Sequence, residues 1–386
     1  MIELIFWTCI GLIFYTYIGY FIVLWIMYSF RNTQRTVKND YFPKVSLIVS
    51  AYNEESVIAD KIDNCKSLEY PEDHLEILFG LDGSTDNTEN IIRKNKNGTI
   101  KHFVFKKQRG KSTVLNDLVY HASGEILIFS DANTIYEQDA IKKLIRHFIN
   151  PQVGGVCGKL ILLDSQAMDI GSKGEKMYWD YETRLKFLEG HVKSVLGANG
   201  AIYAIRKELF EKLPEDKLVI DDFLIPMKVI EKGFKVLYDE TAIGVEYTND
   251  SIWKEFKRKI RIGTGNFNAI PHISKMLSPS KGMIALGLWS HKIIRWFIPF
   301  LGVIVLVANI LLLGKPLYNI ALAIQIGFYV AVLVGALLNS LGIYKNIFAV
   351  IFYFFVVNLA LLIGFYKFVL KSEKPTWKTV KRKSDV

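Results

Sequence analysis

The chain has 386 residues, a formal net charge of +10 and a hydrophobic content of 51%. A mean hydropathy of +0.21 is too high for a purely soluble protein, and the length predicts two folding units rather than one. The positive charge would suit a nucleic-acid binder, but the soluble part lacks the basic stripe with interleaved aromatic residues that such a protein needs. Attraction to an anionic membrane surface and to a phosphorylated small substrate explains the charge without nucleic acid.

The three cysteines, Cys9, Cys65 and Cys157, show neither metal-binding nor redox spacing. One of them lies inside an apolar segment. This pattern predicts a reducing compartment and no disulfide framework.

Residues 1–30 are predicted to form an uncleaved membrane anchor. Glu3 is the only charged residue among positions 2–30, and about 20 apolar residues suffice to span a bilayer. The segment has neither the basic start nor the small-residue cleavage site of a secretory signal. Basic residues follow it at positions 31, 35 and 38. The positive-inside rule therefore predicts an integral protein of the plasma or inner membrane whose next domain is cytoplasmic.

Residues 43–280 have the pattern of a soluble α/β domain. Short buried strands alternate with segments of helical periodicity, which predicts a mostly parallel sheet with helices on its faces. The expected strands are residues 45–50, 75–81, 100–105 and the run 126–133, and the expected helices are residues 54–68, 86–96, 112–121 and 223–232.

Residues 283–370 are membrane-like again. An interfacial segment is expected first, followed by three apolar segments that are each long enough to span. These are residues 283–296, then residues 293–313, 317–340 and 347–370. Three spans here would place the basic tail, residues 371–386, outside, whereas its charge favours the inside. One of the three segments is therefore expected to be re-entrant or interfacial.

Polar residues follow the first two predicted strands, where ligands bind in an open α/β sheet. Tyr52, Asn53 and Glu54 end the first strand, and the run from Asp82 to Asp86 ends the second. Side chains on adjacent strand ends can hydrogen-bond a base and a ribose. For Asp86 the interpretation as the N-cap of the following helix is favoured.

Two further features suit phosphate chemistry. Arg109-Gly110-Lys111 opens a predicted helix, where N–H groups and positive charge suit a diphosphate; a solvated basic loop is the alternative. Asp131 and Asn133 follow a buried strand and offer oxygen ligands to Mg²⁺ or Mn²⁺; a simple Asp/Asn turn is the alternative.

Three features lie further along the chain. Residues 197–201, Gly-Ala-Asn-Gly-Ala, form a small-residue loop that an acceptor can approach. Asp221 and Asp222 precede a predicted helix and suit either a paired N-cap or a general base. The basic run 257–261 has an ordinary interpretation as juxtamembrane charge that attracts anionic lipid.

Together and in this order, these motifs resemble those of the processive membrane glycosyltransferases of family 2, which include the cellulose, hyaluronan, chitin-oligosaccharide and poly-N-acetylglucosamine synthases. The matching runs are VSLIVSAYNEE, LDGSTDNT, SDAN, GANGAIYAIRK and IDDFLIPMKVIEKGFKV. The resemblance implies a Rossmann-like GT-A domain between N- and C-terminal transmembrane helices.

The same resemblance implies the roles of residues around the donor. Asp82 is expected at the uracil, with Tyr52 and Glu54 nearby. Asp131 is expected at the nucleotide diphosphate, and the third position of the SDAN motif on the metal. Asn133 stands at that third position in place of a second aspartate, so the ion would meet a neutral carbonyl and bind less tightly.

By the same match, Asp222 is the catalytic base. The processive enzymes carry QxxRW, whereas the matching run here reads Arg258-Lys259-Ile260-Arg261-Ile262. Arg258 and Arg261 are expected at the diphosphate together with Lys111. The missing Trp removes a stacking surface for the acceptor sugar, which argues against long-chain synthesis.

The implied activity is inverting transfer of a sugar from a nucleotide donor, UDP-linked by the resemblance, to a growing polysaccharide. The alternative acceptor is a polyprenyl phosphate or another lipid-linked saccharide. Membrane lipid and export or accessory subunits are the further expected partners. A rival from another class is a non-catalytic transporter or receptor with a nucleotide-sensing domain, but few ionisable residues occur in the C-terminal apolar segments, where a transport pathway usually has them.

Overall fold

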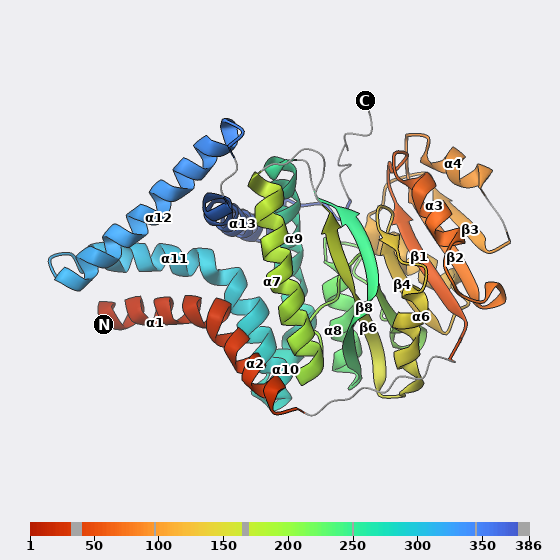
Figure 1. Cartoon of the computed structure of the whole chain (residues 1–386), viewed down its shortest axis with the longest axis horizontal. Coiled ribbons are helices and arrows are strands. Elements are labelled where there is room, and N and C mark those ends of the chain that lie inside the picture. The colour runs from red at the N-terminus through yellow and green to blue at the C-terminus, as the bar shows by residue number, and fades with distance from the viewer. Residues whose placement is uncertain (32–40, 96–97, 164–169, 249–250, 344–345, 377–386) are drawn as a thin grey trace.

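The computed structural model describes residues 1–31, 41–95, 98–163, 170–248, 251–343 and 346–376. Within these residues, an eight-stranded mixed sheet with helices on both faces forms one part of the molecule. A group of long apolar helices forms the other part (Figure 1).

The first half of the sheet is a run of alternating strands and helices. Its elements are β1 Val45–Ala51, α3 Ile58–Lys66, β2 Leu75–Asp82, α4 Thr88–Lys94, β3 Ile100–Phe105, α5 Lys111–His121 and β4 Ile126–Asp131. β1 pairs in parallel with β2 and β4, and β2 pairs in parallel with β3. All residues of β1 are buried, as expected where helices cover both faces of a parallel sheet.

The second half of the sheet contains the antiparallel strands. Its elements are β5 Ile135–Tyr136, α6 Ala140–Ile145, β6 Val153–Leu163, β7 Tyr203–Arg206, α8 Asp221–Glu231 and β8 Lys235–Tyr247. β7 runs antiparallel to both β4 and β6, whereas β8 is parallel to β6. The strand order is β3-β2-β1-β4-β7-β6-β8-β5. The predicted fold class, a mostly parallel α/β sheet, is confirmed.

Two hydrophobic clusters fill the two faces of the sheet. Along β1 the side chains alternate between them, because successive side chains of a strand point to opposite faces. Ile48 belongs to one cluster, and Leu47 and Val49 belong to the other. The cluster of Ile48 extends to Leu288 and Trp296. One continuous core therefore joins the sheet to the apolar helices.

Two long helices that the sequence patterns did not single out lie between the sheet and the apolar helices. They are α7 Ile170–Val192 and α9 Ile252–Ile273 (Figure 1). The side chain of Ser251 caps α9 by accepting a hydrogen bond from the N–H of Trp253. Both helices pack against α13, Asn346–Val369. A Cβ atom at Gly364 would lie 2.9 Å from backbone atoms of α9, so the two helix backbones are in close contact.

Four helical runs among the described residues are long and apolar enough to cross a membrane, by length and composition. They are Ile2–Ser29, Met283–Leu311, Pro316–Ser340 and Ile347–Val369. The first comprises α1 Ile2–Phe14, a π-helical turn Tyr15–Gly19 and α2 Tyr20–Ser29. The second comprises α10 Met283–Gly287, a π-helical turn Leu288–Ile293 and α11 Ile294–Leu311. The third is α12, Pro316–Ser340, and the fourth lies in α13.

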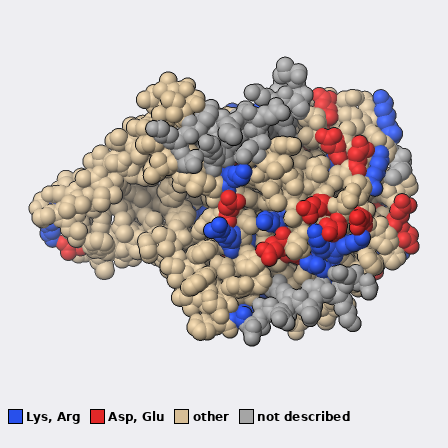
Figure 2. Space-filling model, in the orientation of Figure 1, with Lys and Arg blue, Asp and Glu red and all other residues tan. Residues whose placement is uncertain are grey.

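Residues 283–296, which were expected to lie along the membrane interface, are continuous with α11. A π-helical turn, rather than a break, connects the two parts. On the face shown in Figure 2, the charged side chains gather over the sheet, and the part built from α1, α11 and α12 is almost free of charge. The four long apolar helices fit a membrane protein.

Candidate active site

The loops after β1 and β2 are bound to each other. Asn53, which adopts a left-handed backbone with φ of +53°, donates its N–H to Ser84 Oγ at 3.1 Å and accepts from the N–H of Thr85 at 2.8 Å. The Asp86 carboxylate accepts from the N–H of Thr88, the first residue of α4, at 3.1 Å, but the N-cap position of α4 is Asn87, one residue later than expected. The two strand ends that carry Tyr52, Glu54 and Asp82 therefore form one polar edge.

Asp82 is fully buried at the end of β2 and shapes the neighbouring loop. Its two carboxylate oxygens accept the backbone N–H groups of Arg109 at 2.7 Å and Gly110 at 2.8 Å. Gly110 has φ of +98°, a conformation that strongly favours glycine. Asp82, which was expected at the uracil, thus positions the loop that leads to Lys111.

Lys111, the first residue of α5, bridges two carboxylates from distant parts of the chain. Its Nζ lies 2.9 Å from Asp131 Oδ1 and 3.3 Å from Asp221 Oδ2. Although burial opposes its charge, these two carboxylates raise the pKa of Lys111. The end of β4, the N-terminus of α5 and the first turn of α8 therefore meet at one ammonium group, as the motifs at 109–111, 131 and 221–222 require.

Asp222 lies in the first turn of α8 and is held by the small-residue loop 197–201. Gly200 donates its N–H to Asp222 Oδ2 at 2.9 Å, and Ala198 donates its N–H to the backbone carbonyl of Asp222 at 2.7 Å. Burial and the neighbouring charge of Asp221 raise the pKa of Asp222 to about 6. A carboxylate with a pKa near neutrality is suited to proton abstraction at physiological pH.

The two arginines of the basic run have different charged neighbours. Arg258 is paired with Glu175 of α7 and Glu255 of α9, each at 2.6 Å, so it stabilises the contact between these helices rather than the strand ends. Arg261 is largely buried, which lowers its pKa, while Glu373 and Asp221 act in the opposite direction. The charge of Asp221, one of the two carboxylates at Lys111, therefore acts on Arg261.

The residues expected at the metal suit an ion that is shared with a substrate. Asp131 lies at the carboxyl end of β4 with its side chain 36% exposed, and Asn133 follows in the turn after it. The described residues contain no group of three or more His, Cys, Asp or Glu side chains arranged to hold a metal ion. Mg²⁺ is commonly bound by one or two protein carboxylates together with substrate phosphates. The arrangement fits an ion whose coordination a diphosphate completes.

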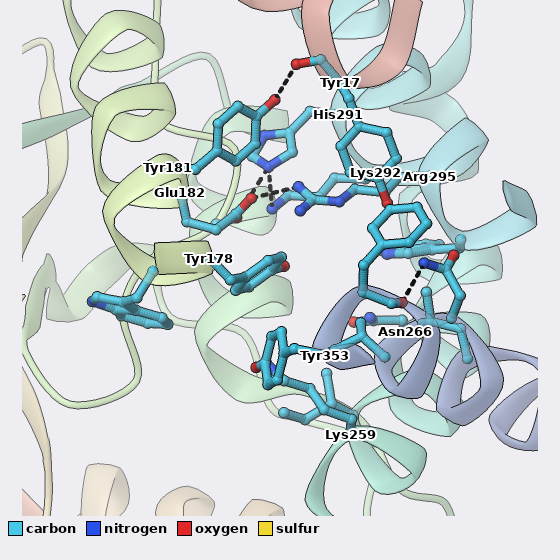
Figure 3. Close-up of a pocket in the computed structure, with 18 of the residues that line it drawn as sticks. Tyr17, Tyr178, Tyr181, Glu182, Lys259, Asn266, His291, Lys292, Arg295 and Tyr353 are labelled. Carbon is cyan, nitrogen blue, oxygen red and sulfur yellow. Dashed lines mark hydrogen bonds and ion pairs between the residues drawn. The ribbon is translucent and has the colours of Figure 1, made fainter. Parts of the chain in front are cut away.

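A cavity of about 570 Å³ connects Asp222 to the apolar helices. The residues that line it come from seven parts of the chain: the turn after α1, α7, the loop 197–201, the start of α8, α9, the run that ends in α11, and α13 (Figure 3). Ten of them are labelled in Figure 3, namely Tyr17, Tyr178, Tyr181, Glu182, Lys259, Asn266, His291, Lys292, Arg295 and Tyr353. Sequence reasoning assigned residues 291, 292 and 295 to a membrane interface. Their charge within an apolar run was the available signal for a functional role.

Comparison with known proteins agrees with this geometry. Residues 46–213 match the family described as Glycosyl transferase family 2. The chain is 26% identical over 306 residues to a probable glycosyltransferase, YdaM, of Bacillus subtilis, covering 75% of this chain and 70% of that protein. It is 24% identical over 362 residues to a poly-beta-1,6-N-acetyl-D-glucosamine synthase of Staphylococcus epidermidis, covering 88% of this chain and 87% of that protein.

A solved structure shares the fold over nearly the whole chain. It is a mannosyltransferase from Pyrobaculum calidifontis in complex with GDP-Man and Mn²⁺, with a TM-score of 0.72 and 20% identity, covering 97% of this chain and 100% of that one. The GT-A fold expected from the sequence is therefore confirmed. The chain contains a glycosyl transferase family 2 domain, and the protein is a glycosyltransferase.

Proposed function

We propose that the protein transfers a sugar from a nucleotide-sugar donor, UDP-linked, to a membrane-held acceptor during polysaccharide synthesis, with inversion at the anomeric carbon. The observation that carries the proposal is the junction at Lys111. It links Asp131 to Asp221, the residue next to Asp222. Residues 43–280 carry the chemistry in this proposal, and residues 1–30 and 283–370 hold the domain at the cytoplasmic face of the membrane.

The donor lies along the ends of β1, β2 and β4 in this scheme. The polar edge of Tyr52, Glu54 and Asp82 faces the nucleoside, and Lys111 and Arg261 face the diphosphate. N–H groups at the start of α5 add to the attraction for phosphate. Mg²⁺ or Mn²⁺, held by Asp131 and Asn133, would neutralise the charge of the departing diphosphate. The Mn²⁺ in the mannosyltransferase complex supports the metal requirement.

Asp222 accepts the proton of the acceptor hydroxyl as that oxygen attacks the anomeric carbon. The N–H of Gly200 at 2.9 Å fixes one carboxylate oxygen and leaves the other for the acceptor. A positioned base contributes roughly 10²–10⁴-fold to such a reaction. The raised pKa of Asp222 suits this role, because a general base is most effective when its pKa lies near the operating pH.

The direct test is to supply purified protein in lipid with a panel of nucleotide sugars and to follow the release of nucleoside diphosphate. The proposal expects one donor to be turned over, with activity lost after exhaustive chelation and restored by Mg²⁺ or Mn²⁺. Release that continues in the chelator would contradict the metal's part in the proposal. Absence of release with every donor would contradict the proposal as a whole.

A second candidate acceptor is a lipid-linked one that receives a single sugar. The cavity between Asp222 and the apolar helices favours it, because its walls are mainly apolar and aromatic side chains. The absence of Trp after Arg261 points the same way. The similarity to poly-beta-1,6-N-acetyl-D-glucosamine synthases over most of the chain favours the polysaccharide. Product length, measured by mass spectrometry of membranes fed with labelled donor, separates the two.

A further inference from the structure

We infer that the cavity beside Asp222 is an acceptor site for a saccharide carried on a lipid phosphate or diphosphate, with Lys292 and Arg295 as the phosphate contacts. This inference rests on the proposed function, since it names the acceptor of the same reaction. It begins from a buried charge whose hydrogen-bonding capacity is only partly used.

Arg295 projects from α11 into the space between α11 and α7 (Figure 3). It is 7% exposed and forms an ion pair with Glu182 through Nη1. Its Nη2 atom is buried and has no hydrogen-bond partner among the described residues. A buried charged nitrogen without a partner is costly. A ligand oxygen in the cavity would remove that cost.

Lys292, one turn before Arg295, is a second cation that lines the cavity. Its Nζ lies 3.3 Å from His291 Nε2, and no ion pair within 4 Å joins it to a carboxylate in the described part of the chain. The carboxylates nearby are already engaged: Glu182 by Arg295 and His291, and Glu189 by His291. The positive charge of Lys292 is thus available to a ligand.

The charge of the whole cavity favours an anion. Four cationic side chains and two carboxylates line it, and one of those carboxylates is the base itself. They are Lys186, Lys259, Lys292 and Arg295, with Glu182 and Asp222. Three tyrosine rings surround the Arg295 guanidinium, with centroid distances of 5.3 Å to Tyr17, 5.0 Å to Tyr178 and 5.8 Å to Tyr181. These rings hold the guanidinium in place.

The apolar part of the lining decides between a free anion and a lipid-linked one. Ile18 from the N-terminal run and Val350, Phe354 and Val357 from α13 line the cavity beside the cations. A free phosphate gains nothing from these side chains, whereas each CH₂ of a lipid chain that is buried against them strengthens binding. Near the base, the Phe223 and Trp296 rings pack edge to face with centroids 5.6 Å apart and add aromatic surface to the cavity wall.

The test is a binding titration on the purified full-length protein in nonionic detergent, followed by intrinsic tryptophan fluorescence. The probes are farnesyl phosphate, farnesol, inorganic phosphate and a chitooligosaccharide. We expect saturable binding of farnesyl phosphate, with farnesol and inorganic phosphate at least about 10-fold weaker, because each lacks one half of the interaction. The Lys292→Gln substitution should weaken the binding of farnesyl phosphate by about 10-fold or more and leave the binding of farnesol unchanged.

Two further variants complete the design. Arg295→Gln should weaken binding as well, but it also breaks the pair with Glu182, so Lys292→Gln is the decisive variant. Lys315→Gln is the control, because Lys315 pairs with Glu3 on an exposed loop before α12 and does not line the cavity; its binding of farnesyl phosphate should match that of the wild type.

Unchanged farnesyl phosphate binding in both cavity variants would overturn the inference, as would farnesol binding equal to that of farnesyl phosphate. Saturable binding of the chitooligosaccharide without farnesyl phosphate binding would overturn it in favour of a saccharide site.

Turnover of the donor with water as the acceptor is measured in parallel by the release of nucleoside diphosphate. This second measurement distinguishes failure of the inference from failure of the proposed function. If the wild type turns over a donor but does not bind farnesyl phosphate, the inference fails and the proposed function stands. If farnesyl phosphate binds as expected and no donor is turned over, the proposed function fails, and the lipid phosphate site stands as a binding site.

Discussion

At the scale of single residues, the account depends on Asp222, a carboxylate kept in an environment that disfavours its charge. Burial and the adjacent Asp221 raise its pKa to about 6, compared with about 3.9 for an unperturbed aspartate. The Gly200 N–H is the hydrogen bond that holds it in position. A base placed in this way costs stability, and that cost can be measured.

The pH dependence of stability follows from the sign of this shift. Because the folded pKa lies above the unfolded one, folded Asp222 binds more protons between about pH 4 and pH 6. The contribution of Asp222 to stability is therefore fully present below about pH 4 and is lost as the pH rises through 6. Asp222→Asn should raise the free energy of unfolding at pH 8 by about 1–2 kcal/mol, a discounted value because Asp222 borders an open cavity, and should change it little at pH 4.

Thermal unfolding in detergent at pH 4 and pH 8 checks this expectation. Asp216→Asn serves as the control, since Asp216 is an exposed aspartate of the same domain. If the Asp222→Asn variant were less stable than the wild type at pH 8, Asp222 would not carry the strained charge described here.

The rate should depend on the same ionisation. Asp222 must be unprotonated to accept the acceptor proton, so kcat/KM should fall as the pH drops through about 6. Initial rates across the range from pH 5 to pH 8.5, with saturating metal, measure this. A profile that is flat down to pH 5 would assign the proton transfer to another group.

At the scale of elements, the sequence predicted the strands that lie at the proposed donor side. β1, β2 and β3 begin and end within one residue of the expected positions, because each is a short run rich in apolar residues that is bounded by turn residues. The helix expected at 54–68 begins only at Ile58, since residues 52–57 form the turn that binds the two strand ends together. The polar edge was predictable because neighbouring parallel strands end at the same side of a sheet.

What escaped prediction involves contacts between segments far apart in the chain. Arg258 was expected at a diphosphate, but it is held by Glu175, which lies in a helix that the sequence patterns did not single out. The cavity likewise forms only where α7, α9 and α13 pack together, and the local sequence pattern of each helix does not predict that packing. The role of Asp82 in holding residues 109 and 110 also depends on a tertiary contact.

The small-residue loop at 197–201 should be intolerant of even one methyl group. A Cβ atom at Gly200 would lie 2.9 Å from Asp222 Oδ2, so Gly200→Ala should displace the base. A displacement of about 1 Å can cost on the order of 10²-fold in rate, while donor binding should persist. Gly302→Ala in α11 is the matched control, because open space surrounds its Cβ position. Equal turnover in both variants would contradict the proposed contact between the loop and the base.

At the scale of the whole molecule, the contacts of residues 371–376 and of α13 bear on which of the three C-terminal apolar segments does not cross the membrane. The backbone of Pro375 lies against Gly110, with its carbonyl oxygen 2.6 Å from the position of a Cβ there, and Thr264 of α9 donates to the carbonyl of Gly364 in α13 at 3.2 Å. In Figure 1, α13 is seen nearly end-on, whereas α11 and α12 run lengthwise. These contacts favour α13 as the segment that does not cross, with residues 371–376 on the same side as the sheet domain.

Labelling of single introduced cysteines in sealed vesicles with a membrane-impermeant maleimide tests this topology. Lys374→Cys should be labelled from the same side as Asp216→Cys on the sheet domain, and Lys315→Cys in the loop before α12 from the opposite side. All three positions are exposed, and the native cysteines are buried. Labelling of position 374 from the side of position 315 would show that α13 crosses the membrane.

The most direct measurement of the central claim compares Asp222→Asn with Asp216→Asn in one assay of nucleoside diphosphate release and donor binding. The account predicts that Asp222→Asn loses at least about 10²-fold in turnover, the lower limit for a positioned base, while it binds the donor as the wild type does and Asp216→Asn keeps full activity. Turnover by Asp222→Asn within a few-fold of the wild type would contradict the claim that this carboxylate is the base.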